Sequence, residues 1–112
     1  MLLNAYAKRS NSDIAAILDR VYNSGVNFVN WMESFHSFVM QVVKFILLKD
    51  INLTMIPSTY SSKIEKYSTS HLVVCLVLAN TLVKLNQELK TTQYLQEMAL
   101  TYLCSVPKKG DK

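Results

Sequence analysis

Residues 28–48 read FVNWMESFHSFVMQVVKFILL, and this stretch decides the fold. Apolar side chains recur in it at steps of three and four, which is the period of an α-helix. The stripe with this spacing is formed by Trp31, Phe35, Phe38, Val42 and Phe45. Further apolar residues widen the stripe beyond one face, namely Met32, Val39, Val43, Ile46 and Leu47. A helix that is apolar over so much of its circumference is central to its domain or also meets a partner.

Helical patterns also occupy the chain on both sides of this stretch. Gly25 separates the long helix from the one before it, because glycine readily adopts the left-handed conformation that ends a helix. The other predicted helices cover residues 2–9, 11–24, 58–67 and 71–89, and a last helix is capped by Thr91 or Thr92 and ends at Pro107. The sequence therefore predicts an all-α bundle of five or six helices, with the longest near 28–49 and 71–90.

Residues 73–77 are apolar and rich in β-branched side chains, so a strand is the alternative interpretation there. Apolar positions continue at helical spacing through Leu82 and Leu85, and the sequence offers no second strand to pair with this one. We therefore predict a helix. In the last helix the expected apolar face includes Leu95, Met98 and Tyr102.

Composition supports one helical domain over residues 1–112, with 106–112 as a solvated tail. Half of the 112 residues are hydrophobic, which excludes intrinsic disorder. Two glycines and two prolines are too few for a turn-rich β-sandwich or barrel. Two cysteines, Cys75 and Cys104, form neither a disulfide framework nor a zinc site with paired ligands, and we interpret them as reduced core thiols.

The charge pattern does not resemble a nucleic-acid interface. The net charge is +4, but the basic residues are dispersed, and the one dense group is Lys108, Lys109 and Lys112 in the tail. A nucleic-acid site would need a stripe of cations on one face. We therefore expect no direct nucleic-acid contact. The apolar runs are also shorter than the roughly 20 residues that span a bilayer, and no signal peptide is present, so we expect a cytoplasmic protein without membrane contact.

No group of residues has the spacing of an active site. Two glycines cannot form a phosphate-binding loop, and the only histidines, His36 and His71, have no metal-ligand spacing around them. We expect no catalytic, cofactor-binding or metal-binding residue, and hence no enzyme activity of this chain. The candidates for a core or partner interface are Trp31, Phe35, Phe38, Val42, Phe45, Leu95, Met98 and Tyr102.

Three segments carry a resemblance to a known family. Residues 15–27 read AAILDRVYNSGVN, residues 45–50 read FILLKD, and residues 93–103 read QYLQEMALTYL. Together with the polar break at 68–70, they resemble the helical third domain, or collar domain, of the gamma/tau subunit of the bacterial DNA polymerase III clamp loader. The resemblance covers residues 10–105. The family often has an arginine before the leucines of its long helix, and residues 40–43 here contain none.

The resemblance implies a structural role in DNA replication. In the family, collar domains of five subunits form a ring that holds the ATPase modules together while a sliding clamp is loaded on DNA. The chain would then be a piece of a larger AAA+ protein, with ATP and Mg²⁺ bound only by the parent's ATPase domain. Its expected partners are the other clamp-loader subunits, with weak self-association.

Two alternatives stay open from the sequence. The first interprets the chain as a free-standing helical adaptor with an unrelated partner, and the second interprets it as a helical nucleic-acid binder. The apolar residues of 28–48 can also be explained as the core of a monomer.

Overall fold

The computed structural model describes residues 2–56, 59–60, 64–65, 67 and 69–104. Its α-helices are α1 (Leu2–Ala7), α2 (Asn11–Asn23), α3 (Phe28–Leu48), α5 (Leu72–Leu89) and α6 (Leu95–Cys104). Two short 3₁₀ turns, Ile51–Leu53 and Thr69–His71, lie between α3 and α5. These residues contain no strand. The predicted all-α fold is confirmed, as are the two longest helices.

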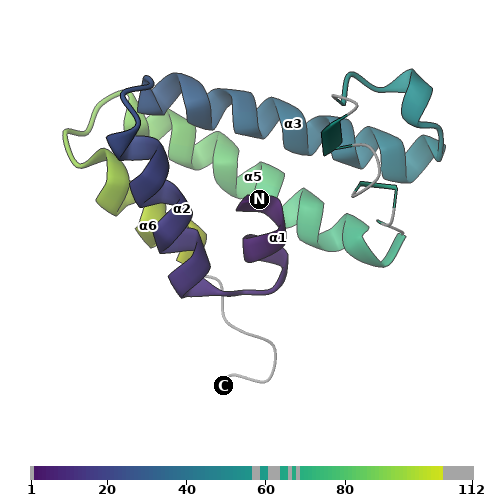
Figure 1. Ribbon diagram of the computed structural model, residues 1–112, viewed down its shortest axis with the longest axis horizontal. Helices are drawn as coiled ribbons and strands as arrows, with labels where there is room; N and C mark the ends of the chain where they lie inside the picture. The colour runs from purple at the N-terminus through teal and green to yellow at the C-terminus, as the bar shows by residue number, and fades with distance from the viewer. Residues whose placement is uncertain (1, 57–58, 61–63, 66, 68, 105–112) are drawn as a thin grey trace.

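The two long helices, α3 and α5, lie side by side and form the body of the molecule (Figure 1). At one end of this pair, α6 packs against both α2 and α5. The short α1 packs on α2. This arrangement encloses one hydrophobic core, to which all five helices contribute buried side chains.

Local signals at the helix ends explain where α3 begins and ends. The Asn27 side chain accepts a hydrogen bond from the Asn30 backbone N–H at 2.9 Å, which satisfies one of the free donors of the first turn. Gly25, between α2 and α3, has a φ of +91°, a conformation that side-chain-bearing residues rarely adopt. At the other end, Lys49 adopts the left-handed conformation with φ +59° and closes the helix.

The side of α3 that faces the core is rotated from the predicted stripe. The buried residues of α3 are Phe28, Met32, Phe35, Val39, Val42, Val43, Phe45 and Ile46. Three residues of the predicted stripe, Phe35, Val42 and Phe45, are among them. Trp31 and Phe38 are only half-buried and pack at the edge of the core. The physical reason is that α1 and α2 cover this flank of α3 incompletely.

The C-terminal helices follow the predicted pattern with one shift. Residues 73–77 are helical, as predicted, and Cys75 is fully buried. The last helix starts at Leu95, two or three residues later than a cap at Thr91 or Thr92 predicts, and the Thr92 hydroxyl accepts a hydrogen bond from the Tyr94 backbone N–H at 3.1 Å. Leu95, Met98 and Tyr102 are half-buried against the core.

Two further predictions concern the connection and the chain end. Of the short helix predicted at 58–67, the structure describes residues 59–60, 64–65 and 67, and Thr59, Tyr60 and Ile64 among them are helical. The predicted tail, 106–112, lies outside the described residues.

Helix α5 is long and apolar enough to cross a membrane, judged by length and composition alone. The 18 residues that meet this criterion are the whole helix, including Lys84 and Glu88, which lie beyond the apolar run of about a dozen residues. In the structure α5 is packed between α3 and α6, which is also typical of a core helix in a soluble domain.

Candidate protein interface

A groove opens on the flank of α3 that α1 and α2 leave uncovered. It has a volume of about 390 Å³. We call it the aromatic groove, and its lining residues are Leu2, Ile17, Arg20, Trp31, Ser34, Phe35, Phe38 and Tyr60. The groove brings together three of the predicted interface candidates, Trp31, Phe35 and Phe38. The other five do not line it.

The aromatic side chains of this groove hold one another in place. The rings of Trp31 and Phe35 are stacked, with centroids 5.7 Å apart and an interplanar angle of 12°. The Phe38 ring meets the Tyr60 ring edge-on, at 5.5 Å and 66°. Aromatic pairs in such geometries stabilise each other beyond the area that they bury. The groove therefore presents a preformed apolar wall.

Among the residues that the structure describes, Arg20 is the only charged one that lines the aromatic groove. The acidic residues nearest to the groove in sequence are engaged elsewhere. The Asp19 carboxylate accepts a hydrogen bond from the Gln96 side chain of α6 at 3.3 Å. The Glu33 carboxylate lies 3.6 Å from the Lys90 ammonium group. Arg20 is therefore the charge that the described residues present to the groove itself.

A second apolar surface lies on α5, and sequence reasoning missed it. We call it the α5 stripe, and it consists of the exposed residues Val73, Leu76, Val77 and Val83. Leu76 and Val77 follow Val73 by three and four residues, and Val83 follows Leu76 by seven, so the four side chains lie on one side of the helix. Val73 is 67% exposed, a large fraction for an apolar side chain in the middle of the chain. The signal was present in the sequence, because α5 is apolar all round and one helix side must face outward.

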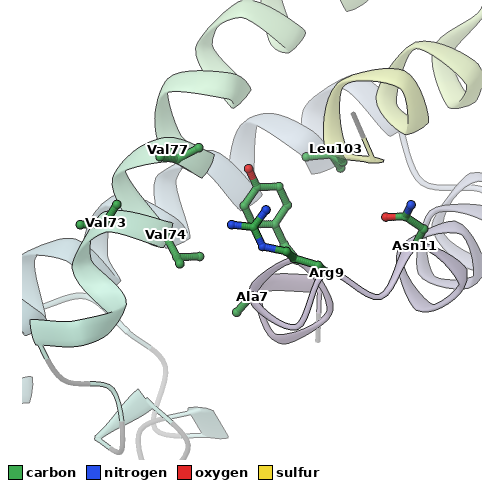
Figure 2. Close-up of a pocket in the computed structure, with 8 residues that line it drawn as sticks. Ala7, Arg9, Asn11, Val73, Val74, Val77 and Leu103 are labelled. Carbon is green, nitrogen blue, oxygen red and sulfur yellow. The ribbon is translucent and has the colours of Figure 1, made fainter. Parts of the chain in front are cut away.

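One end of the α5 stripe borders a small hollow of about 120 Å³. Val73, Val74 and Val77 of α5 line one side of it, and Ala7 and Arg9 lie on the other side, at the end of α1 (Figure 2). Leu103 of α6 closes the hollow. Helix α1 thus borders both surfaces, since its first residue, Leu2, lines the aromatic groove.

The remaining chemistry of the described residues is that of a packed core. They contain no group of three His, Cys, Asp or Glu side chains that could hold a metal ion. Burial raises the pKa of the Cys75 thiol to about 11, and burial also raises the pKa of Cys104. Both thiols are therefore held in the protonated form, which is the unreactive form.

The buried thiol of Cys75 predicts a loss of stability in alkali. The unfolded thiol has a pKa of 9.0, whereas the folded one stays protonated until about 11. As the pH rises through this window the unfolded state loses a proton that the folded state keeps, so stability falls by about 2–3 kcal/mol. Urea unfolding at a series of pH values between 8 and 11 measures this fall in the free energy of unfolding.

Cys75→Ala is the matched control for the alkaline loss. Burial also raises the pKa values of Tyr6 and Tyr67, but these groups are present in both proteins. The stability of Cys75→Ala should therefore decline less steeply with pH. Equal slopes for the two proteins would contradict the assignment of the loss to Cys75.

Comparisons of the chain with protein-family models, with curated proteins and with solved structures find no match. Function is therefore inferred from the residues themselves and from the two apolar surfaces.

Proposed function

We propose that this chain is a non-catalytic subunit-association domain, the collar domain of a clamp-loader subunit of the gamma/tau type in DNA polymerase III. The observation that carries the proposal is the presence of two separate apolar surfaces on one all-helical domain, the aromatic groove and the α5 stripe. A subunit of a closed ring contacts two neighbours through two different surfaces. Grouped exposed apolar side chains of this kind are typical of protein contact surfaces.

The local geometry around residues 15–27 also supports this proposal. This stretch resembles the family in its apolar-periodic helix, its glycine turn and the Asp or Asn that opens the long helix. Each feature has a physical role in this chain: α2 buries Ile14 and Leu18, Gly25 adopts a positive φ, and Asn27 caps α3. The motif therefore consists of residues that the fold requires at these positions.

The proposed partners are the other subunits of a cytoplasmic clamp loader. ATP and Mg²⁺ would be bound by the ATPase domain of the parent protein, and the collar would contribute no group to hydrolysis. Contacts between copies of this chain would be weak, because each association costs entropy and the ring is completed by several different subunits.

Co-purification with clamp-loader subunits tests the proposal. The tagged chain is mixed with the other subunits of a bacterial clamp loader at low and at high salt. Apolar contacts predict that binding persists as salt rises, because screening weakens only the charge contribution. Val77→Glu, on the α5 stripe, should weaken binding about tenfold or more, as expected for a charge placed in an apolar contact.

Met55→Glu is the matched control for this substitution. Met55 is 84% exposed and lies in the connection after α3, outside both surfaces. It should bind like the unmodified chain. If no loader subunit binds at either salt, the proposal is wrong and the helical adaptor is favoured. Loss of protein binding at high salt together with DNA binding would favour the nucleic-acid binder.

A further inference from the structure

The aromatic groove carries a cation that no described residue balances. Arg20 is exposed on α2 and makes no hydrogen bond or ion pair with the part of the chain that the structure describes. It also borders an adjoining hollow between α1 and α2, where Lys8 and Asp13 face the same space. Those two charges offset each other, so the positive charge of Arg20 is left for an outside group.

The apolar wall of the groove has the spacing of a helix contact. Trp31, Phe35 and Phe38 follow one another along α3 at steps of four and three. Seven residues of an α-helix rise by about 10 Å, which is close to two turns. An amphipathic helix laid along this wall can place side chains from two successive turns against it, which is the usual mode of helix recognition by an apolar groove.

We propose that the aromatic groove receives an amphipathic helix of a partner protein, with large apolar side chains against Trp31 and Phe38 and a carboxylate that pairs with Arg20. The occupant is thus an acidic amphipathic segment. This inference deepens the proposed function and rests on it for the source of the helix, which would be a neighbouring loader subunit. The chemistry of the groove is tested with synthetic peptides, without that subunit.

A nucleic acid fits the groove less well than a helix does. Binding of a phosphate backbone uses several cations along one track, and Arg20 is alone among the lining residues. The observations therefore favour an apolar helix with one acidic contact.

The fluorescence of Trp31 reports occupancy of the groove directly, because it is the single tryptophan of the chain. The probes are three alanine-based helical peptides without tryptophan. They share a leucine and a phenylalanine one turn apart and differ only in one flanking residue, which is Glu, Gln or Lys. The Glu peptide should shift the Trp31 emission to the blue and bind about two- to fivefold tighter than the Gln peptide, with the Lys peptide weakest.

Variants of Arg20 separate the charge from the apolar contact. Arg20→Gln should bind the three peptides equally, and Arg20→Glu should prefer the Lys peptide. Lys84→Gln, which removes an exposed cation outside the groove, should keep the preference for Glu. Phe38→Ala should weaken all three peptides alike. Equal affinity of the three peptides for the unmodified chain, or no change in Trp31 emission, would overturn the inference.

The remaining outcomes distinguish this inference from the proposed function. If loader subunits bind but the peptides do not, the chemistry assigned to the groove is wrong and the collar proposal stands. If the peptides bind as expected but no loader subunit does, the groove is a helix-binding site of another kind of protein. Quenching of Trp31 by oligothymidylate, without peptide binding, would overturn the inference in favour of a nucleic-acid site.

Discussion

Met32→Ala is expected to lower the free energy of unfolding by about 2–5 kcal/mol, whereas Trp31→Ala, one residue earlier, is expected to lower it by only about 1–2 kcal/mol. The order is the reverse of what side-chain size suggests. Met32 is fully buried between α3 and its neighbours, so its truncation leaves a cavity. Trp31 lies at the open flank of α3, where water can fill the space that the ring leaves.

Urea unfolding followed by circular dichroism measures both variants, since the tryptophan signal is lost in one of them. Each variant should unfold in a single transition with an unchanged dependence on urea concentration. In titration calorimetry, which needs no tryptophan signal, the Trp31→Ala protein should also lose affinity for all three helical peptides, while Met32→Ala should keep it wherever the protein is folded. A larger loss for Trp31→Ala than for Met32→Ala would place Trp31 in the core.

This pair of residues shows what the sequence could and could not predict about α3. The period of the apolar residues is a local property, and it predicted the helix and nearly its full length. The direction in which the helix faces is set chiefly by its packing on α5, which is distant in sequence. Because 28–48 is apolar over most of its circumference, the pattern alone does not distinguish Trp31 from Met32 as the core residue.

The candidate site was predictable in part for the same reason. Helical spacing grouped Trp31, Phe35 and Phe38, and the structure brings them to one groove. Leu2, Arg20 and other lining residues reach it through tertiary packing, which no local pattern encodes. Similarly, α5 was predicted as a helix, but only its packing decides that Val73 faces outward and Cys75 inward.

Asn86 is the one buried polar residue among those described, and it lies between α5 and α3. Its side-chain amide donates a hydrogen bond to the Met32 backbone carbonyl at 3.5 Å, and its own side-chain oxygen has no partner in the described structure. Asn86→Asp is expected to lower the free energy of unfolding at neutral pH by about 3–5 kcal/mol. The substitution removes the donor and places an unpaired carboxylate against a carbonyl oxygen.

The pH dependence of Asn86→Asp identifies the cause of this loss. Burial disfavours the charged form and so raises the pKa of the introduced carboxyl in the folded state. Above that raised pKa the full penalty is present. As the pH falls toward the unfolded pKa of about 3.9, the folded state takes up a proton first and the penalty shrinks. Unfolding free energies of the variant and the unmodified chain should therefore converge between neutral pH and about pH 4.

Asn86→Leu is the control that removes both the hydrogen bond and the unpaired oxygen. It should change the free energy of unfolding by less than about 1 kcal/mol, because the Met32 carbonyl can still accept a hydrogen bond within α3 and an apolar side chain suits the site. If Asn86→Asp were as stable as the unmodified chain at neutral pH, its side chain would be in water. If Asn86→Leu were clearly less stable than the unmodified chain, the hydrogen bond to Met32 would contribute more than the buried polar oxygen costs. The alignment of α3 and α5 would then depend on that hydrogen bond.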